Sequence, residues 1–203
     1  MRIAREGYPL ILVAAVVSVV AFYVDWQWVG FLAAGIALIF AGFFRDPDRQ
    51  PPSGEGLVLS PADGRVVAIR EAGESGTQLS IFLSPLDVHI NRSPITGKVK
   101  EAQYQPGRFH AAFRDKASEL NERNAITLVD PKGKRLRVVQ IAGVLARRIV
   151  CYVKAGDSLD IGQRLGLIMF GSRVDVFFPP GAQTQVSEGQ RVKGGETVIG
   201  KLS

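Results

Sequence analysis

Two long uncharged segments near the N-terminus limit what this chain can fold into. Residues 8–24 and 28–44 contain no acidic or basic side chain, and only the tripeptide DWQ separates them. Each segment has about 17 residues, near the lower limit for a helix that crosses the hydrocarbon core of a bilayer. The sequence therefore predicts that residues 1–44 form a membrane-anchoring helical hairpin, either transmembrane or re-entrant.

The residues that flank this hairpin predict its orientation. Arginines precede the first apolar segment and follow the second, and the cytoplasmic flanks of transmembrane helices are typically basic. Trp26 and Trp28 lie at the turn, where indole rings fit the headgroup layer. A cleaved signal peptide is disfavoured, because a second apolar segment follows and no small-residue cleavage pattern is present. We expect the rest of the chain on the cytoplasmic face of the inner cell membrane.

The chain changes character after the hairpin. Residues 45–56, RDPDRQPPSGEG, are rich in proline, glycine and charge, which is typical of a linker. Residues 57–203 contain short alternating apolar segments between turn residues, for example GRVVAI and TQLSIFLS, and this predicts a mainly β barrel or sandwich. Residues 155–168 resemble residues 188–202, and glycine turns repeated in this way are typical of lipoyl-like hairpins.

Composition limits the classes of molecule that this chain is expected to bind. The net charge is +6, and a basic domain tethered to a membrane favours an anionic phospholipid surface. No zinc-finger spacing or aromatic RNA-binding pattern is present, so nucleic acid is not expected as a partner. The single cysteine, Cys151, excludes an internal disulfide and a cysteine-rich metal site. Residues 108–124, which include His110, have helical apolar spacing and predict an amphipathic helix that caps the barrel or lies against the bilayer.

Three polar residues at the ends of predicted strands are candidates for chemistry. Asp63 lies in SPADG, His89 in LSPLDVHINRSP, and Ser172 follows a glycine inside the strand pattern of MFGSRVDVFF. A carboxylate that orients a histidine, which in turn activates a serine, needs three such groups to converge. Each residue also has a structural explanation: a turn aspartate, a hydrogen-bonded histidine, and a β-bulge at the glycine.

Four segments, taken in their order along the chain, resemble segments of one protein family. SPADG, SPLDVHINRSP, NER at 121–123 and FGS at 170–172 are similar to segments of the short form of phosphatidylserine decarboxylase, and the resemblance extends from about residue 56 to the C-terminus. It implies a proenzyme that cuts itself between Gly171 and Ser172. The products would be a β chain of residues 1–171 and an α chain of residues 172–203.

The resemblance also implies the cofactor and the roles of the three candidates. The hydroxyl of Ser172 would attack the preceding carbonyl, and β-elimination and hydrolysis would leave a covalent pyruvoyl group at its position. His89, held by Asp63, would act as the base. The pyruvoyl group would react with the amine of phosphatidylserine and would serve as the electron sink for loss of its carboxylate, giving phosphatidylethanolamine and carbon dioxide. No metal is implied.

The expected substrate is an anionic phospholipid. Arg92, Arg147 and Arg148 are candidates for its phosphate, because a guanidinium group makes charge-assisted hydrogen bonds to phosphate oxygens. Longer members of the family have a second histidine where this chain has Arg92. A homodimer is compatible with this interpretation.

Two other functions compete with the enzyme hypothesis. A non-catalytic, membrane-tethered lipoyl-like barrel that acts as an adaptor would explain the internal repeat and would give Ser172 no role. A zinc peptidase needs about three protein ligands and is disfavoured, since the chain has only two histidines.

Overall fold

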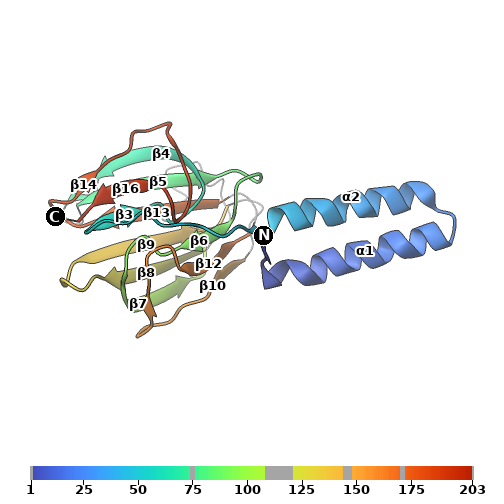
Figure 1. The fold of residues 1–203 in the computed structure, drawn as a ribbon, viewed down its shortest axis with the longest axis horizontal. Coiled ribbons are helices and arrows are strands. Elements are labelled where there is room, and N and C mark those ends of the chain that lie inside the picture. The colour runs from blue at the N-terminus through green and yellow to red at the C-terminus, as the bar shows by residue number, and fades with distance from the viewer. Residues whose placement is uncertain (1, 74–75, 108–120, 144–147, 170–171, 203) are drawn as a thin grey trace. The chain divides into compact units, whose positions relative to one another are not determined.

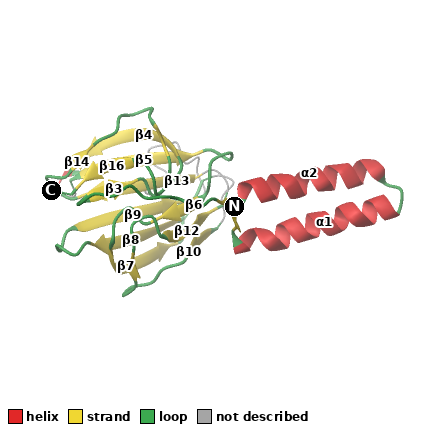
Figure 2. Cartoon of the chain, in the orientation of Figure 1, coloured by secondary structure: helices red, strands yellow, loops and turns green. Residues whose placement is uncertain are grey.

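The computed structural model describes all residues except 1, 74–75, 108–120, 144–147, 170–171 and 203 (Figure 1). The chain divides into two compact units, Met1–Asp48 and Arg49–Ser203. The first is helical and the second is built from strands, so the prediction of a mainly β chain with N-terminal apolar helices is confirmed (Figure 2). Most of the predicted amphipathic helix, including His110, lies outside the described residues, and its last two residues belong to a strand instead.

The first unit is a helical hairpin. The 3-10 helix η1 (Arg5–Gly7) leads into α1 (Tyr8–Tyr23), and α2 (Gln27–Phe43) packs against it. Ser18 Oγ donates a hydrogen bond to the carbonyl oxygen of Gly30 at 2.9 Å, which joins the helices near their turn. The short strands β1 (Arg2–Ile3) and β2 (Arg45–Asp46) pair antiparallel and close the hairpin at its open end.

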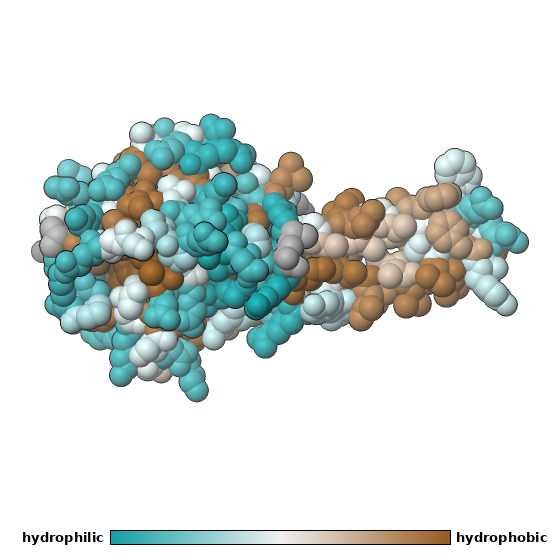
Figure 3. All heavy atoms as spheres, in the orientation of Figure 1, coloured by the Kyte–Doolittle hydropathy of each residue, from teal (hydrophilic) through white to brown (hydrophobic). Residues whose placement is uncertain are grey.

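Both helices expose apolar side chains. Val19 on α1 is 68% exposed and Leu38 on α2 is 73% exposed. Figure 3 shows brown, apolar residues along the helices, whereas teal residues dominate the visible face of the β unit. By length and composition the helical segment Arg5–Tyr23 is apolar enough to cross a membrane, while α2 is apolar but shorter. An apolar surface of this extent marks an interaction site in soluble proteins and suits membrane association.

The described residues of the second unit form three antiparallel sheets (Figure 1). The order in the largest is β11-β7-β8-β9-β13-β5-β4-β15, and it curls into a half-barrel; the two smaller sheets have the orders β10-β12-β6 and β14-β16-β3. The strands are β3 (Leu57–Leu59), β4 (Gly64–Glu71), β5 (Thr77–Leu83), β6 (Ile90–Arg92), β7 (Gly97–Gln105), β8 (Arg123–Val129), β9 (Arg135–Ile141), β10 (Ile149–Cys151), β11 (Ser158–Leu159), β12 (Arg164–Ile168), β13 (Ser172–Phe178), β14 (Gln183–Thr184), β15 (Arg191–Val192) and β16 (Val198–Lys201).

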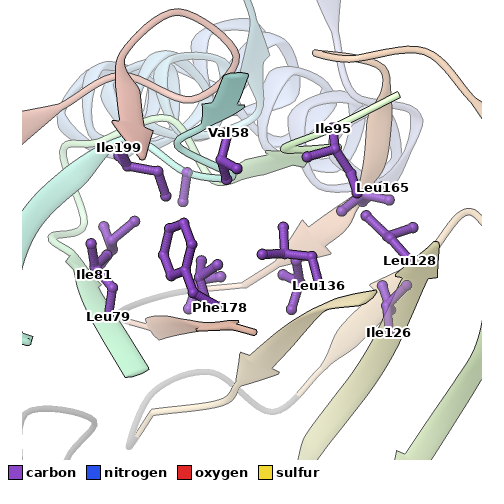
Figure 4. Packing of buried hydrophobic residues seen from close by; sticks show 14 of the residues in the cluster. Val58, Leu79, Ile81, Ile95, Ile126, Leu128, Leu136, Leu165, Phe178 and Ile199 are labelled. Atoms are coloured by element: carbon purple, nitrogen blue, oxygen red, sulfur yellow. The ribbon is translucent and has the colours of Figure 1, made fainter. Parts of the chain in front are cut away.

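One hydrophobic core lies between these sheets. Val58 of β3 and Leu165 of β12 come from the small sheets and face side chains of the large sheet (Figure 4). Phe178, at the end of β13, is fully buried among them. Burial of a side chain of this size stabilises a fold by about 1.5–3 kcal/mol, so the alternating apolar positions that predict the strands also account for the core.

The two copies of the internal repeat fold alike. Gly156 and Gly189 both have positive φ, +96° and +85°, a conformation that glycine adopts without steric cost. Each glycine is followed by a two-residue strand, β11 or β15, and then by a longer strand, β12 or β16. Their assignment as lipoyl-like hairpins stays a prediction.

Strand β13 occupies a central position in the large sheet, between β5 and β9. Val174, Val176 and Phe178 point into the core, and the period of two places Ser172 in the same inward row. Arg173 and Asp175 lie on the opposite face, where Arg173 Nε is 2.9 Å from Asp175 Oδ1 and both side chains are at most 5% exposed. Gln78 Nε2 donates to Asp175 Oδ2 at 2.9 Å.

This buried ion pair makes β13 sensitive to loss of one partner. Asp175→Ala leaves the Arg173 guanidinium buried opposite an uncharged residue, so we expect the free energy of unfolding to fall by about 3–5 kcal/mol. Urea denaturation of the purified protein measures this. The double variant R173M/D175L removes both charges and is expected to recover part of the loss. A single variant as stable as wild type would contradict this role.

Candidate active site

Ser172 is the first residue of β13 and lies opposite Leu83, the last residue of β5. It is fully buried. Its Oγ has no hydrogen-bond partner within the described part of the chain. Buried hydroxyls are nearly always paired, and leaving one unpaired costs roughly 1–3 kcal/mol. Structural stability therefore gives no reason for a serine here, whereas chemistry at this hydroxyl would.

His89 lies in the segment between β5 and β6. It directly precedes β6 and is fully buried, and its carbonyl oxygen accepts a hydrogen bond from Ile168 N at 3.4 Å. Ile168 ends β12, the strand that precedes Ser172 in the chain. His89 Nδ1 lies 2.9 Å from the carbonyl oxygen of Asp87. A carbonyl only accepts, so in a neutral ring Nδ1 carries the proton and Nε2 is the basic nitrogen.

Asp63 directly precedes β4 on the other side of β5 from Ser172. Its carboxylate accepts hydrogen bonds from Arg49 Nη2 at 3.0 and 2.8 Å and from the backbone N–H of Gly194 at 2.8 Å. The structure thus brings Asp63 to the same end of the sheet as Ser172, but pairs it with an arginine rather than with His89. Its expected contact with His89 is not among its hydrogen bonds to described residues.

Two of the three arginines expected to bind phosphate can be placed. Arg92 is 5% exposed and donates from Nη1 to the carbonyl oxygen of Gly162 at 3.0 Å. Together with Arg49 and Arg164 it lines an open hollow of about 660 Å³ that also contains acidic side chains. Arg148 is exposed just before β10. Arg147, like Gly171 at the expected cut, lies outside the described residues.

Sequence reasoning missed a set of buried amides in the same region. Asn124 Nδ2 donates to Gln140 Oε1 at 2.9 Å, and Gln140 Nε2 donates to Asn91 Oδ1 at 2.8 Å. We call these three residues the amide relay. The alternation of these strands contains a signal for them. Asn124 lies two residues before Ile126 and Gln140 lies two residues after Val138, so both occupy inward positions, where a polar residue is unexpected.

Comparison with known proteins places the chain in a family. The family model for phosphatidylserine decarboxylase matches residues 36–200. The chain belongs to the phosphatidylserine decarboxylase family. The matched region includes Ser172, His89, Asp63 and the amide relay.

Individual members of the phosphatidylserine decarboxylase family are similar over nearly their full length. The phosphatidylserine decarboxylase proenzyme of Symbiobacterium thermophilum is 48% identical, with 98% of this chain and 95% of the relative covered. The proenzyme of Solidesulfovibrio magneticus is 45% identical over the same shares, and that of Azorhizobium caulinodans is 48% identical over 97% and 88%. Similarity of this extent does not favour a non-catalytic adaptor.

Proposed function

We propose that this chain decarboxylates phosphatidylserine to phosphatidylethanolamine and carbon dioxide, using a pyruvoyl group made from Ser172. Membership of the phosphatidylserine decarboxylase family supports the overall reaction. The observation that carries the assignment of the site is the Ser172 hydroxyl, which is fully buried and unpaired among the described residues. The names of the relatives, which call them proenzymes, support a processing step before catalysis.

The processing step uses the chain's own atoms. Ser172 Oγ bonds to the carbonyl carbon of Gly171, the amide bond between the two residues breaks, and the released nitrogen takes up a proton. Removal of the α proton of residue 172 then breaks its Cβ–O bond, and Gly171 leaves as a carboxylate. The remaining dehydroalanine is hydrolysed with loss of ammonia, which leaves the pyruvoyl group at the start of residues 172–203.

A serine hydroxyl needs a base for this attack, and we propose His89. A positioned histidine typically accelerates a proton transfer by about 10²–10⁴-fold. His89 is buried near the end of β12, and its contact with the Asp87 carbonyl leaves Nε2 as the basic nitrogen. The buried setting of Ser172 suits the pyruvoyl group, because it limits access of water to a reactive carbonyl. When formed, this group supplies the electron sink for decarboxylation.

Asp63 has two competing roles, which a pair of variants separates. As the partner of Arg49 it stabilises the fold, so Asp63→Ala and Arg49→Ala should each lower the free energy of unfolding by roughly 1–3 kcal/mol, with little further loss in the double variant. As the residue that orients His89, it should also be needed for rapid self-cleavage. Slow cleavage in D63A but not in R49A would support the orienting role, and equal rates would leave only the structural one.

The substrate explains the other features. Phosphatidylserine stays in the bilayer, so we propose that the hairpin holds the β unit at the cytoplasmic face of the inner membrane. The apolar helical segment Arg5–Tyr23 and the arginines beside it support this placement. We propose that Arg92, Arg147 and Arg148 bind the lipid phosphate, and the hollow beside Arg92 provides room for a headgroup. Self-association into a homodimer stays a prediction.

Release of carbon dioxide tests the proposed function. Purified full-length protein is mixed with detergent micelles that contain phosphatidylserine labelled at the serine carboxyl carbon. We expect labelled carbon dioxide and an equal amount of phosphatidylethanolamine. Micelles with labelled free serine are the control for a lipid substrate. Protein that is fully cleaved at Ser172 but releases no carbon dioxide from phosphatidylserine would contradict the proposal.

A further inference from the structure

Ser172 Oγ and Asn91 Nδ2 are both buried polar atoms of the β unit that have no hydrogen-bond partner among the described residues, each other included. Both residues are fully buried. Folded proteins pair nearly all buried donors and acceptors, so an amide donor without a partner needs an explanation.

The amide relay fixes the direction in which Asn91 donates. Gln140 accepts from Asn124 with its oxygen, which turns its own N–H groups towards Asn91. The oxygen of Asn91 is thereby occupied as an acceptor, and Nδ2 is the donor at the end of the relay. All three side chains are at most 3% exposed, so bulk water does not compete for these hydrogen bonds.

The strand register brings the relay close to Ser172. Gln140 of β9 is the partner of Val174 in β13, two residues from Ser172 in the same inward row. Diagonal neighbours of this kind lie roughly 7–8 Å apart across a sheet. The Gln140 amide reaches from there to Asn91 at 2.8 Å. Gln140, the middle residue of the relay, therefore lies diagonally across from Ser172 on the interior side of β13.

A glycine leaves room for this arrangement. Gly166 of β12 is the register partner of Asn91. A β-carbon at Gly166 would lie 3.1 Å from Gln140 Nε2 and would collide with the carbonyl oxygen of Val150. Any side chain there would push against the amide relay, so the position of the relay requires a glycine at residue 166.

We propose that Asn91 Nδ2 donates a hydrogen bond to Ser172 Oγ while that oxygen reacts, and that Gln140 and Asn124 position it. This inference rests on the proposed function. Negative charge develops on Oγ in the processing step when the Cβ–O bond breaks and the oxygen leaves as part of a carboxylate. A positioned donor stabilises such charge most effectively in a dry interior.

The charged donor that follows Ser172 in the chain is directed elsewhere. Arg173 follows Ser172 in the chain, but the alternation of β13 places it on the opposite face, where it pairs with Asp175. An amide is also suited to this task because it stays uncharged throughout the pH range in which histidine titrates. A neutral donor beside Ser172 therefore does not oppose protonation of His89 when that residue accepts the serine proton.

The matched pair Asn91→Ala and Asn91→Ser tests the assignment. Both variants shorten the side chain to a similar size, but only serine keeps a donor. The rate of conversion from one chain to two is followed by denaturing mass spectrometry on freshly purified full-length protein, well below each variant's melting temperature. We expect N91A to convert about 100-fold more slowly than wild type. N91S should convert at an intermediate rate although its melting temperature is similar to that of N91A.

Two further variants separate an effect on the reaction from an effect on folding. Gln140→Met breaks the relay but keeps Asn91, and we expect a conversion rate between those of wild type and N91A; this variant decides the test if neither Asn91 variant folds. Gln78→Met removes a carboxamide that bonds Asp175 on the far face of the sheet, and should convert at the wild-type rate. Conversion of N91A at the wild-type rate would overturn this assignment and leave the proposed function standing. If only Q140M folds, conversion of Q140M at the wild-type rate would do the same. A wild-type protein that never converts would overturn the proposed function and this inference with it.

Discussion

Replacement of Ser172 by alanine is expected to leave one chain of 203 residues with no decarboxylase activity. Alanine removes the only oxygen that can attack the carbonyl of residue 171 from position 172, and it also removes the precursor of the pyruvoyl group. The effect should be complete rather than partial, because no later step can begin. Denaturing electrophoresis and the carbon dioxide assay measure the two losses separately.

Stability provides the necessary control for this variant. The Ser172 hydroxyl has no hydrogen-bond partner among the described residues, so its removal should not lower the melting temperature. Ser80→Ala on the neighbouring strand β5 is a matched change, since Ser80 is also buried, and it should cleave and react normally. Cleavage of S172A at the wild-type rate would show that another residue starts the reaction.

His89→Gln is expected to slow self-cleavage by about 10²–10⁴-fold. Glutamine is similar in length, and its amide can still donate to the carbonyl oxygen of Asp87, but it provides no base for the Ser172 proton. The conversion of full-length protein into two chains, followed over days, gives the rate. A small amount of slowly formed two-chain product would also allow decarboxylation to be assayed without His89.

The result for H89Q separates two roles of this residue. If the cleaved fraction of H89Q decarboxylates as fast per active site as wild type, His89 serves self-cleavage only. If that fraction is also slow, His89 acts in both reactions. Self-cleavage of H89Q at the wild-type rate would exclude His89 as the base.

Local patterns predicted the parts of the fold that depend on alternation. The inward row of Val174, Val176 and Phe178 could be recognised from the sequence, because a half-buried strand repeats every two residues. The apolar segments likewise predicted helices α1 and α2 within a few residues of their ends. The order of the strands in three sheets could not be predicted, since it depends on pairings between distant segments.

In the candidate site too, local patterns identified individual residues, but they could not predict contacts between distant segments. Asp63, His89 and Ser172 could be selected because each stands at the end of a strand pattern. The partner of Asp63 could not be predicted: Arg49 looked like a flank of the apolar hairpin, yet its side chain is 9% exposed and paired with that carboxylate. The amide relay joins segments near residues 91, 124 and 140, and only the folded sheet brings them together.

The intact mass of purified wild-type protein under denaturing conditions tests the central claim most directly. We predict two chains, residues 1–171 and residues 172–203, and we predict that the smaller one begins with a pyruvoyl group and therefore has no free amine at its start. A single chain of full mass in protein that releases carbon dioxide from phosphatidylserine would contradict this account. A smaller chain that begins with an unmodified serine would contradict it equally.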